Sequence, residues 1–379
     1  MASSKYLQSW VALHLVPGMG PVTCNKLVVH FGTPSKVLAA TIKDLTAVCR
    51  LRRESLDALN PDGRQNLIEL AKDEIEQASE RNITIIACDD PLYPSLLKNI
   101  HDPPVVLYVL GKPEMLNCKG IGIVGSRAAT HYGRSIAEQM ANSLARQGFT
   151  IISGMALGVD TAAHKGALAA EGSTIAVLGC GLDIIYPPGN HGLYKDIAFS
   201  GAVVSEYPLG TLPDNFRFPA RNRIISGLSL GVVVVEAANR SGSLITASHA
   251  LEQGREVFAV PGRIDSVKSA GTHTLLQQGA KLVHSVNDIA EEFIYAAPLE
   301  NQVDTGNEEE QEFFAQLNQE EKALLTCLEV YPRTIDEIVR ESGFTPQKAN
   351  ELLLLLELKG MVHPLPGKCY QRVAGQAGK

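Results

Sequence analysis

The chain has 379 residues, a formal net charge of −7 and 45% hydrophobic residues. This length suits two or three domains with ordinary buried cores, and the composition excludes collagen-like, wholly disordered and disulfide-rich scaffolds. No apolar run reaches the roughly 20 residues of a membrane span, and the first residues lack the pattern of a signal peptide. Seven scattered cysteines without a Cys-x-x-Cys pair predict reduced, mostly buried thiols in a cytoplasmic protein without a zinc ribbon.

Most of the negative charge lies in one segment. Residues 300–321 contain eight acidic residues and no lysine or arginine, so leaving them out changes the net charge from −7 to +1. We expect an acidic linker at 298–318, although a solvated loop without further role explains the same composition more simply. The acidic balance therefore does not exclude nucleic acid as a ligand, and local patches decide the question.

Residues 1–85 are predicted to form a helical domain. Within it, Gly18 and Gly20 form a Gly-x-Gly turn before an amphipathic segment with apolar residues at helical spacing. Such a turn is typical of the helix-hairpin-helix motif, whose backbone amides hold a DNA phosphate, and Lys26 would add positive charge. An ordinary helical hairpin packed on the next domain explains these residues equally well, so they are only a candidate accessory DNA contact.

Residues 86–297 alternate between short β-branched runs and helix-length stretches. Strands that are apolar on both faces and alternate with helices are typical of a mostly parallel sheet covered on both sides. We therefore predict an extended Rossmann-like, doubly wound α/β domain, whose ligands would bind beyond the carboxyl ends of the strands. The predicted strands are residues 121–124, 149–152, 174–178, 202–205, 232–235 and 257–260.

Residues 319–379 are predicted to form a winged-helix-like domain. A first helix ends at Gly343, and a second begins with Thr345 as N-cap and Pro346 at the first helical position. A short hairpin after the second helix would be the wing. Because the second helix has little positive charge, it would read a DNA groove only weakly, and a protein-contact or regulatory role explains it at least as well.

The segments after the predicted strands are rich in glycine and serine, which let backbone amides and hydroxyls approach phosphates. Arginine beside an aromatic ring can hold the phosphate backbone while the ring stacks on a base. The stretch between the acids at 214 and 236 combines both residue types: Arg217, Arg221, Arg223, Phe216 and Phe218. Each loop alone has an ordinary structural explanation, but their convergence on one sheet edge favours a nucleic-acid site.

Several of these segments resemble the signature blocks of the DprA/Smf family of DNA-processing proteins. The resemblance covers the whole chain, and the blocks occur in the order typical of the family. They are residues 90–98, 103–111, 124–127, 153–160, 218–227, 233–237, 241–247 and 257–262. One departure is Pro188-Gly189-Asn190, because members often have a lysine in that loop.

The resemblance implies a Rossmann-like domain that forms a homodimer and binds single-stranded DNA in a basic pocket. It also implies a SAM-like or helix-hairpin-helix-like N-terminal domain, protection of incoming DNA during natural transformation, and loading of the RecA recombinase. Together with the two phenylalanines, the motifs place the strand against Gly125, Ser126, Arg127, Ser153, Gly154, Phe216, Phe218, Arg221, Asn222, Arg223, Ser241, Gly242 and Ser243.

Enzymatic alternatives have less support. Gly120–Gly125 matches Gly-x-Gly-x-x-Gly but overlaps a strand instead of following it, so we predict no dinucleotide site. A phosphoribohydrolase-like nucleotide hydrolase remains the alternative, although Ser248 and His249 stand where that family would need acids. Asp160 and His164 have spacing usable for acid–base or metal chemistry, but a helix cap and a structural hydrogen bond explain them more simply. We expect no catalytic residue, metal or cofactor.

Overall fold

The computed structural model describes residues 4–293, 317–328, 333–359, 361–365, 367 and 369–372. The chain divides into two compact units, Met1–Glu292 and Phe293–Lys379. The predicted acidic linker lies almost entirely outside the described residues, which include only its last two positions. Over the described residues, none of the helices combines the length and the apolar character needed to cross a membrane.

The first unit begins with a group of helices, as predicted. Asn60 and Thr41 cap two of them, each accepting a hydrogen bond from a first-turn amide, and proline opens three. Trp10 is fully buried among these helices, as expected of a core residue. The helices are α1 (Ser4–His14), α2 (Pro21–Phe31), α3 (Pro34–Ala39), α4 (Ile42–Val48), α5 (Arg53–Ala58) and α6 (Pro61–Glu80).

A nine-stranded sheet follows, with the order β1-β2-β6-β5-β4-β3-β7-β8-β9. Strands β3 to β9 are parallel, whereas β1 and β2 pair antiparallel with each other and β2 pairs antiparallel with β6. All six predicted strands are confirmed, and β1, β2 and β9 are additional. The strands are β1 (Ile83–Ala87), β2 (Val106–Gly111), β3 (Gly120–Val124), β4 (Thr150–Ser153), β5 (Thr174–Leu178), β6 (Ala202–Ser205), β7 (Gly231–Val234), β8 (Glu256–Ala259) and β9 (Lys281–Leu282).

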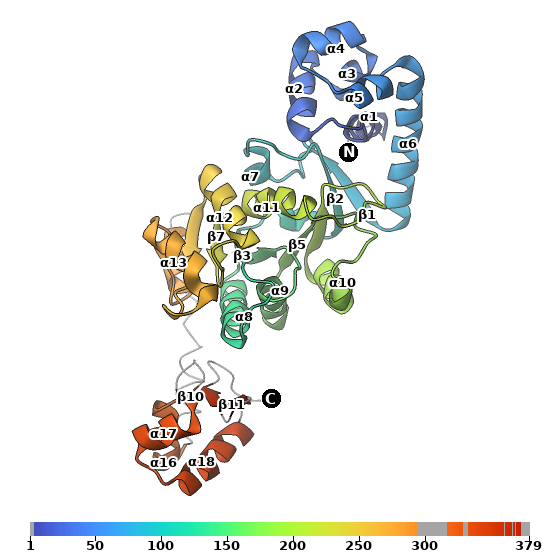
Figure 1. Cartoon of the computed structure of the whole chain (residues 1–379). Coiled ribbons are helices and arrows are strands. Elements are labelled where there is room, and N and C mark those ends of the chain that lie inside the picture. The colour runs from blue at the N-terminus through green and yellow to red at the C-terminus, as the bar shows by residue number, and fades with distance from the viewer. Residues whose placement is uncertain are drawn as a thin grey trace. The chain divides into compact units, whose positions relative to one another are not determined.

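Helices cover both faces of the sheet, which explains why its strands are apolar on both sides. Alternate residues of β5 show this: Leu178 packs in one core cluster with Ile197 of α10, and Val177 packs in another with Ile225 of α11. Figure 1 shows α8, α9 and α10 on one face and α11 and α12 on the other. The helices are α7 (Ser95–Lys98), α8 (His131–Arg146), α9 (Val159–Ala169), α10 (His191–Ser200), α11 (Arg217–Leu228), α12 (Gly242–Glu252), α13 (Ala270–Gln277) and α14 (Asn287–Phe293).

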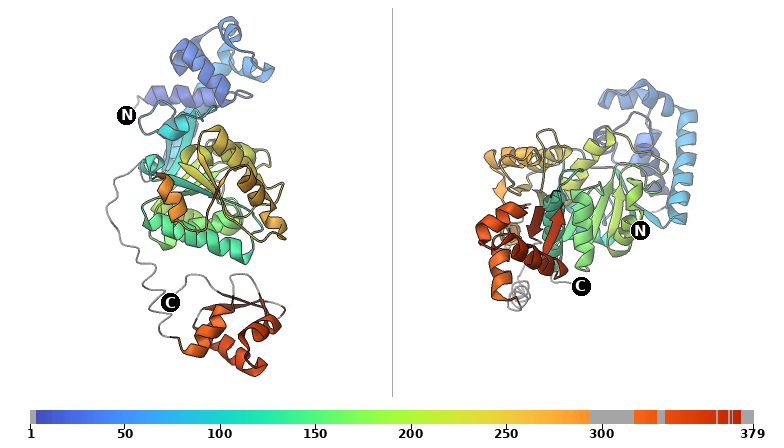
Figure 2. Two further views of the ribbon diagram at one scale, coloured as in Figure 1. Left: turned by 90° about the vertical axis from the view of Figure 1, so that its left-hand side faces the viewer. Right: turned by 60° about the horizontal axis from the view of Figure 1, so that its bottom comes forward.

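The N-terminal helices share a core with the sheet. Trp10, Leu45, Ile83 and Tyr108 belong to one buried cluster, and the helices stand at the β1–β2 end of the sheet (Figure 2). The boundary proposed between residues 85 and 86 falls inside β1, which extends the sheet directly from the end of α6.

The C-terminal unit has helix-turn-helix and hairpin elements. Thr345 caps α18 with Pro346 at its first position, and Gly343 ends α17 with φ of 70°, both as predicted. The elements are α16 (Gln319–Thr326), β10 (Arg333–Thr334), α17 (Ile335–Ser342), α18 (Pro346–Leu358), β11 (Val362–Leu365) and β12 (Cys369–Arg372), with strand order β10-β12-β11.

The cysteines are all free, but the expectation that most are buried is wrong. Only Cys24 and Cys180 are buried, and the other five are half-buried. Cys49, Cys118 and Cys327 each stand at the C-terminal end of a helix, where the chain returns to the surface.

His164 makes the structural hydrogen bond that the sequence suggested. Its Nδ1 lies 2.7 Å from the Thr174 hydroxyl, which itself donates to the Ile151 carbonyl at 2.7 Å. The imidazole Nδ1–H is therefore the donor to Thr174. The ring is fully buried in α9, and this burial lowers the pKa of His164 to about 3.

A substitution at His164 tests this assignment. Because the pKa is lowered in the folded state, the unfolded chain binds the extra proton, and stability is lost as the pH falls below about 6.5. The free energy of unfolding of the wild type should therefore fall relative to His164→Gln by about 1 kcal/mol per pH unit between about pH 6 and pH 5. Urea unfolding followed by fluorescence of Trp10, the single tryptophan, measures it. If the free energies of unfolding of the wild type and His164→Gln changed in parallel with pH, the assignment would be contradicted.

Candidate nucleic-acid interface

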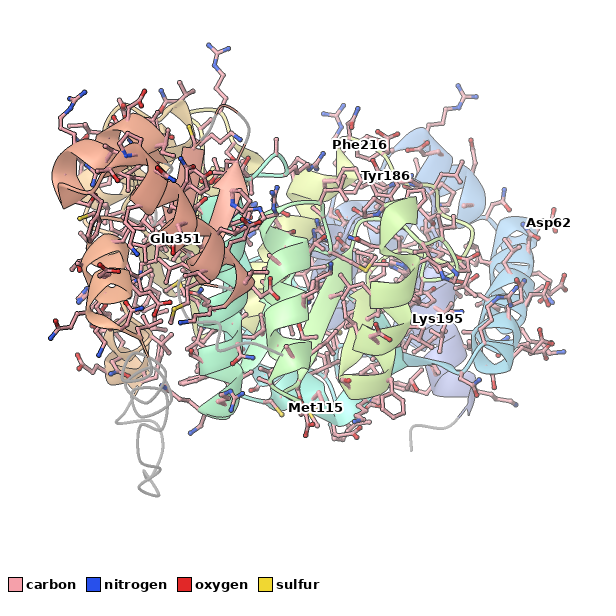
Figure 3. All side chains as sticks on the ribbon, turned by 90° about the horizontal axis from the view of Figure 1, so that it is seen from below. Asp62, Met115, Tyr186, Lys195, Phe216 and Glu351 are labelled. Carbon is pink, nitrogen blue, oxygen red and sulfur yellow. The ribbon has the colours of Figure 1, made fainter. Side chains whose placement is uncertain are left out.

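The parallel strands bring the segments that follow them to one edge of the sheet, which we call the carboxyl edge. Tyr186 and Phe216 lie at this edge, and Met115, which precedes β3, lies at the opposite one (Figure 3). The segments that meet there are residues 125–130, 154–158, 179–187, 206–216 and 235–241. The predicted glycine-rich and serine-rich loops are therefore brought together as expected for a parallel sheet.

Arginine and aromatic side chains pack together at this edge. The rings of Tyr186 and Phe218 stack with centroids 5.5 Å apart and an interplanar angle of 28°. The Arg127 guanidinium carbon lies 5.2 Å from the centroid of Phe218. Arg127 is exposed, and the described residues give it no ion pair. Three segments that are distant in sequence thus form one amphipathic surface.

A second arginine extends this surface. The Arg217 guanidinium carbon lies 5.1 Å from the centroid of Phe216 and 5.5 Å from that of Tyr207. Phe216 is 66% exposed, which is far more than a core phenylalanine. We call Arg127, Tyr186, Phe216, Arg217 and Phe218 the edge cluster. Its members can attract phosphates and offer ring faces to bases.

Tyr186 was not predicted to be a site residue, since only the folded loop brings it to Phe218. The Tyr-Pro sequence of this loop was the available signal, but it does not specify a stacking partner. Asn190, in the same loop, turns inward and donates 2.9 Å hydrogen bonds to the Met155 carbonyl and the Thr161 hydroxyl. The loop that lacks a lysine is thus fastened to α9 by an asparagine.

The first turn of α12 adds a backbone donor. Ser241 is its N-cap and accepts a hydrogen bond from the Ser243 amide, and the two serine hydroxyls lie 2.7 Å apart. The Asn222 amide donates to the Gly242 carbonyl at 3.2 Å, which ties this turn to α11. Gly242 is exposed. The Leu244 amide donates to the Ser241 carbonyl at 3.1 Å, so within the described contacts only the Gly242 amide of this turn is available to an anion.

Gly125 and Ser126 directly follow β3 and lead to Arg127, as predicted. The Ser126 carbonyl accepts a hydrogen bond from the Val159 amide at 3.2 Å. A Cβ atom on Gly158, which has φ of 83°, would lie only 2.3 Å from that carbonyl oxygen. Residue 158 must therefore be glycine for the turn to pack on the start of α9.

Ser153 and Gly154 have a different role from the one expected. The Ser153 hydroxyl is buried and donates to the Ile123 carbonyl at 2.6 Å. The Gly154 amide donates to Asp160 at 3.1 Å, and its carbonyl accepts from Arg221 at 2.9 Å. A Cβ at residue 154 would lie 2.6 Å from the Arg221 guanidinium. These groups are used inside the protein, so we leave both residues out of the proposed contact surface.

Arg221 is a buried cation beneath the edge. It donates to the Gly154 and Val177 carbonyls, and burial lowers its pKa to about 10. Asp160 accepts from the Gly154 and Ala156 amides, and burial raises its pKa to about 6, against the opposing effect of Arg221. The predicted cap role of Asp160 is wrong, because Gly158 is the N-cap of α9 and Asp160 instead holds the loop before it.

Arg223 is turned away from the edge cluster. Its guanidinium forms ion pairs with Asp102 at 2.8 Å and with Glu206 at 2.6 Å, and its side chain is 7% exposed. The positive charge of Arg223, which we expected to contact DNA phosphates, is therefore neutralised by two carboxylates of the protein. We also leave Arg223 out of the contact surface.

Glu236 is an acid that follows β7 at the same edge. Its carboxylate accepts hydrogen bonds from the Thr130 amide at 2.9 Å and from the Thr130 hydroxyl. Thr130 is the N-cap of α8, so the buried Glu236 fixes the start of that helix. No group of His, Cys, Asp and Glu residues suited to a metal ion occurs among the residues that the structure describes.

The candidate accessory contact at Gly18, Gly20 and Lys26 lies at the start of α2, next to an acidic side chain. Gly20 is the N-cap of α2, and Lys26 is exposed on that helix. Gly18, with φ of 70°, faces Glu54, whose carboxylate oxygen would lie 2.0 Å from a Cβ at that residue. Because a phosphate there would meet this carboxylate, we do not include the turn in the proposed interface.

Comparisons with known proteins agree with the motifs. The family described as DNA recombination-mediator protein A matches residues 84–294, and the DprA winged helix domain matches residues 314–368. Protein Smf of Synechocystis is 35% identical over 96% of this chain and 98% of its own length.

Solved structures show the same likeness. The crystal structure of DNA processing protein A from Streptococcus pneumoniae matches with a TM-score of 0.65 and 35% identity, over 77% of this chain and 99% of that one. A structure described as giving insight into the single-stranded DNA binding mode of the Helicobacter pylori protein matches with a TM-score of 0.52 and 32% identity, over 57% of this chain and 97% of that one. The chain therefore belongs to the DprA/Smf family of DNA-processing proteins.

Proposed function

We propose that the chain binds single-stranded DNA at the carboxyl edge, through phosphate contacts and base stacking and largely without sequence preference. The observation that carries the proposal is the edge cluster, in which Arg127 lies over Phe218 and Phe218 stacks on Tyr186. The likeness to the Helicobacter pylori structure, whose description names a single-stranded DNA binding mode, supports it.

The chemistry of the edge cluster favours a single strand over a duplex. A base can stack on an aromatic ring only when its face is free, and the bases of a duplex are already stacked on one another. Phe216 and Tyr186 are 66% and 39% exposed and can offer such ring faces. Arg127 and Arg217 lie beside aromatic rings, so phosphates and bases would be held by neighbouring groups.

Phosphates would also meet backbone donors. The first turn of α12, with Ser241 as its N-cap, and the Gly125-Ser126 turn end at the same edge. Buried Arg221 does not contact the strand, since its guanidinium is occupied by carbonyl groups and lies near the Asp160 carboxylate. Ser243 is buried and its amide donates to Ser241, so we leave it out. The proposed contact residues are Gly125, Ser126, Arg127, Tyr186, Phe216, Arg217, Phe218, Asn222, Ser241 and Gly242.

We also propose that the protein acts by binding and handing over a strand, without catalysis. Asp160 and His164, the pair with acid–base spacing, are both buried and make structural hydrogen bonds. A general acid or base must reach the substrate, and neither group lies at the surface.

The family supports a wider role. We propose that the chain forms a homodimer through its Rossmann-like domain, protects incoming DNA and loads RecA during natural transformation; the description of the matched family as a recombination mediator is the support. Light scattering measures the dimer, and RecA ATP hydrolysis on a strand covered by single-strand-binding protein measures loading. A monomer, or no stimulation of RecA, would contradict this extension.

Replacing Arg127 tests the phosphate contacts. Arg127→Ala should weaken binding to a single-stranded oligonucleotide and lower the slope of log K against log salt by about 1, because one phosphate contact is lost. Fluorescence anisotropy over a salt series measures both. Arg146→Ala is the matched control, since Arg146 is exposed in the last turn of α8, at the opposite edge. Equal affinities and slopes for the two variants would refute this placement.

Replacing Phe216 tests stacking. Phe216→Ala should cost about 1–3 kcal/mol of binding free energy while leaving the salt slope unchanged, because a ring contact releases no counterions. The same anisotropy series applies. Phe199→Ala is the control, because Phe199 is 82% exposed at the end of α10, before β6 begins. A loss of affinity no larger than that of Phe199→Ala would exclude Phe216 as a stacking residue.

A further inference from the structure

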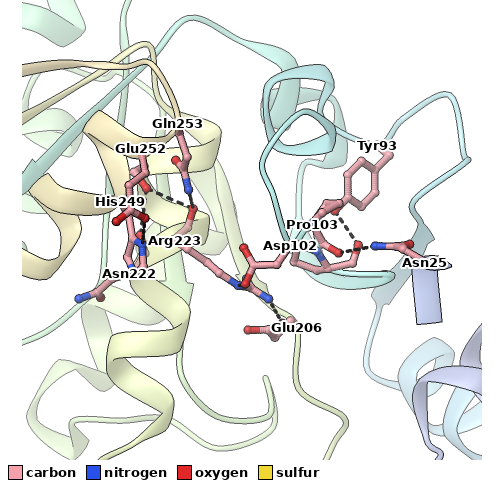
Figure 4. Close-up of polar contacts among 12 residues, drawn as sticks. Asn25, Tyr93, Asp102, Pro103, Glu206, Asn222, Arg223, His249, Glu252 and Gln253 are labelled. Carbon is pink, nitrogen blue, oxygen red and sulfur yellow. Dashed lines mark hydrogen bonds and ion pairs between the residues drawn. The ribbon is translucent and has the colours of Figure 1, made fainter. Parts of the chain in front are cut away.

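Arg223 joins three parts of the first unit that are distant in sequence. It belongs to α11, Asp102 lies between α7 and β2, and Glu206 follows β6 directly. The Arg223 Nε lies 2.8 Å from an Asp102 oxygen, and its Nη2 lies 2.6 Å from a Glu206 oxygen. Figure 4 shows the guanidinium between the two carboxylates.

Further hydrogen bonds extend this junction on both sides. The Arg223 carbonyl accepts from the Gln253 amide, at the end of α12, at 3.0 Å. Pro103, next to Asp102, accepts from Asn25 of α2 at 3.2 Å. The Asp102–Arg223 pair therefore lies on a continuous path from the N-terminal helices to the two helices that carry the candidate interface (Figure 4).

The junction is largely buried. The side chains of Arg223 and Glu206 are 7% and 8% exposed, whereas that of Asp102 is 37% exposed. The two carboxylates raise the pKa of Arg223 against the opposing effect of burial. Moving the Arg223 guanidinium away from its carboxylates would leave a buried charge unpaired and destabilise the folded protein. Arg223 therefore stays within reach of both Asp102 and Glu206.

The same helix carries the edge cluster. Arg217 and Phe218 occupy the first turn of α11, and Arg221 fastens the next turn to the carbonyls of Gly154 and Val177. Residues 221 and 223 are two positions apart, so their side chains leave the helix about 200° apart. Arg221 thus fixes α11 on the side of the sheet edge, and Arg223 fixes it on the other side.

We propose that Asp102 and Arg223 are positioning residues of the DNA site: their ion pair sets the orientation of α11, and thereby the placement of Arg217 and Phe218, without contacting the strand. This inference rests on the proposed function. It contrasts with the assignment of Arg223 as a phosphate contact, in which the guanidinium would leave its carboxylates for the DNA.

Asp102→Asn separates the two roles, because they predict changes of opposite sign. If Arg223 contacts phosphate, loss of a competing carboxylate frees it, so binding tightens and the salt slope becomes steeper. If the pair positions α11, single-strand affinity falls by roughly three- to tenfold, and the slope stays the same or becomes shallower because Arg217 is displaced from its phosphate. Asp102 is the gentler place to intervene, because it is the most exposed of the three and the Arg223–Glu206 pair remains.

The experiment compares full-length wild type, Asp102→Asn, Arg223→Lys and the control Glu80→Gln by anisotropy with a labelled oligothymidylate over a salt series. Glu80→Gln removes the same charge from an exposed carboxylate at the end of α6 and should leave affinity nearly unchanged. Arg223→Lys keeps the charge but cannot reach both carboxylates with a planar fork, so it should weaken binding in the same way as Asp102→Asn. Trp10 fluorescence during urea unfolding checks that each variant is folded.

Weaker binding by folded Asp102→Asn and Arg223→Lys, with a slope no steeper than that of the wild type, supports the positioning role. Wild-type or tighter binding by Asp102→Asn overturns it while leaving the proposed function intact. A steeper slope in Asp102→Asn also overturns it, because it marks an Arg223 guanidinium released to a phosphate. If the wild type does not bind the oligonucleotide, the proposed function fails, and the positioning role fails with it.

Discussion

Two buried guanidinium groups hold α11 across the carboxyl edge, and the candidate interface depends on them. Arg221 is bonded to carbonyls at the ends of β4 and β5, and Arg223 is paired with Asp102 and Glu206. A helix anchored on opposite sides cannot rotate without leaving buried charges unpartnered, which would cost several kcal/mol. The exposed side chains at its start therefore stay in one orientation, and a preorganised surface binds with less loss of entropy.

The arginines of this edge divide into two kinds by their surroundings. Arg221 and Arg223 satisfy groups inside the protein, whereas Arg127 and Arg217 lie beside aromatic rings. The nearby Glu236 carboxylate accepts hydrogen bonds from Thr130, the N-cap of α8, and so takes part in fixing the start of that helix. The result is a chain with a net charge of −7 that still presents arginine and aromatic groups together at one edge of a sheet.

Much of the architecture follows from local sequence patterns. The apolar β-branched runs predict six strands because a parallel sheet buries both faces of each strand. The strands β1 and β2 were not predicted, because they are antiparallel additions next to the N-terminal helices. The caps of the C-terminal unit were predicted correctly, since Thr345-Pro346 and Gly343 act through local backbone geometry.

Assignment of roles within the site was harder, for a geometric reason. Arg217, Arg221 and Arg223 look alike in the sequence, but helical rotation sends them to different surroundings. Ser153 and Gly154 form a motif typical of phosphate loops, yet their polar groups bond to Ile123, Asp160 and Arg221. Tyr186 enters the site only through contact with Phe218, from a loop more than thirty residues away. Such partners depend on tertiary structure.

The most direct test of single-strand binding at the carboxyl edge is the affinity of the unmodified protein for single strands and duplexes of the same sequence. Anisotropy titrations from about 50 to 200 mM salt, with a purine mononucleotide as competitor, measure it. We expect a clear preference for the single strand that weakens as salt rises and that the mononucleotide does not displace. Equal or stronger binding of the duplex, or displacement by the mononucleotide, would contradict it.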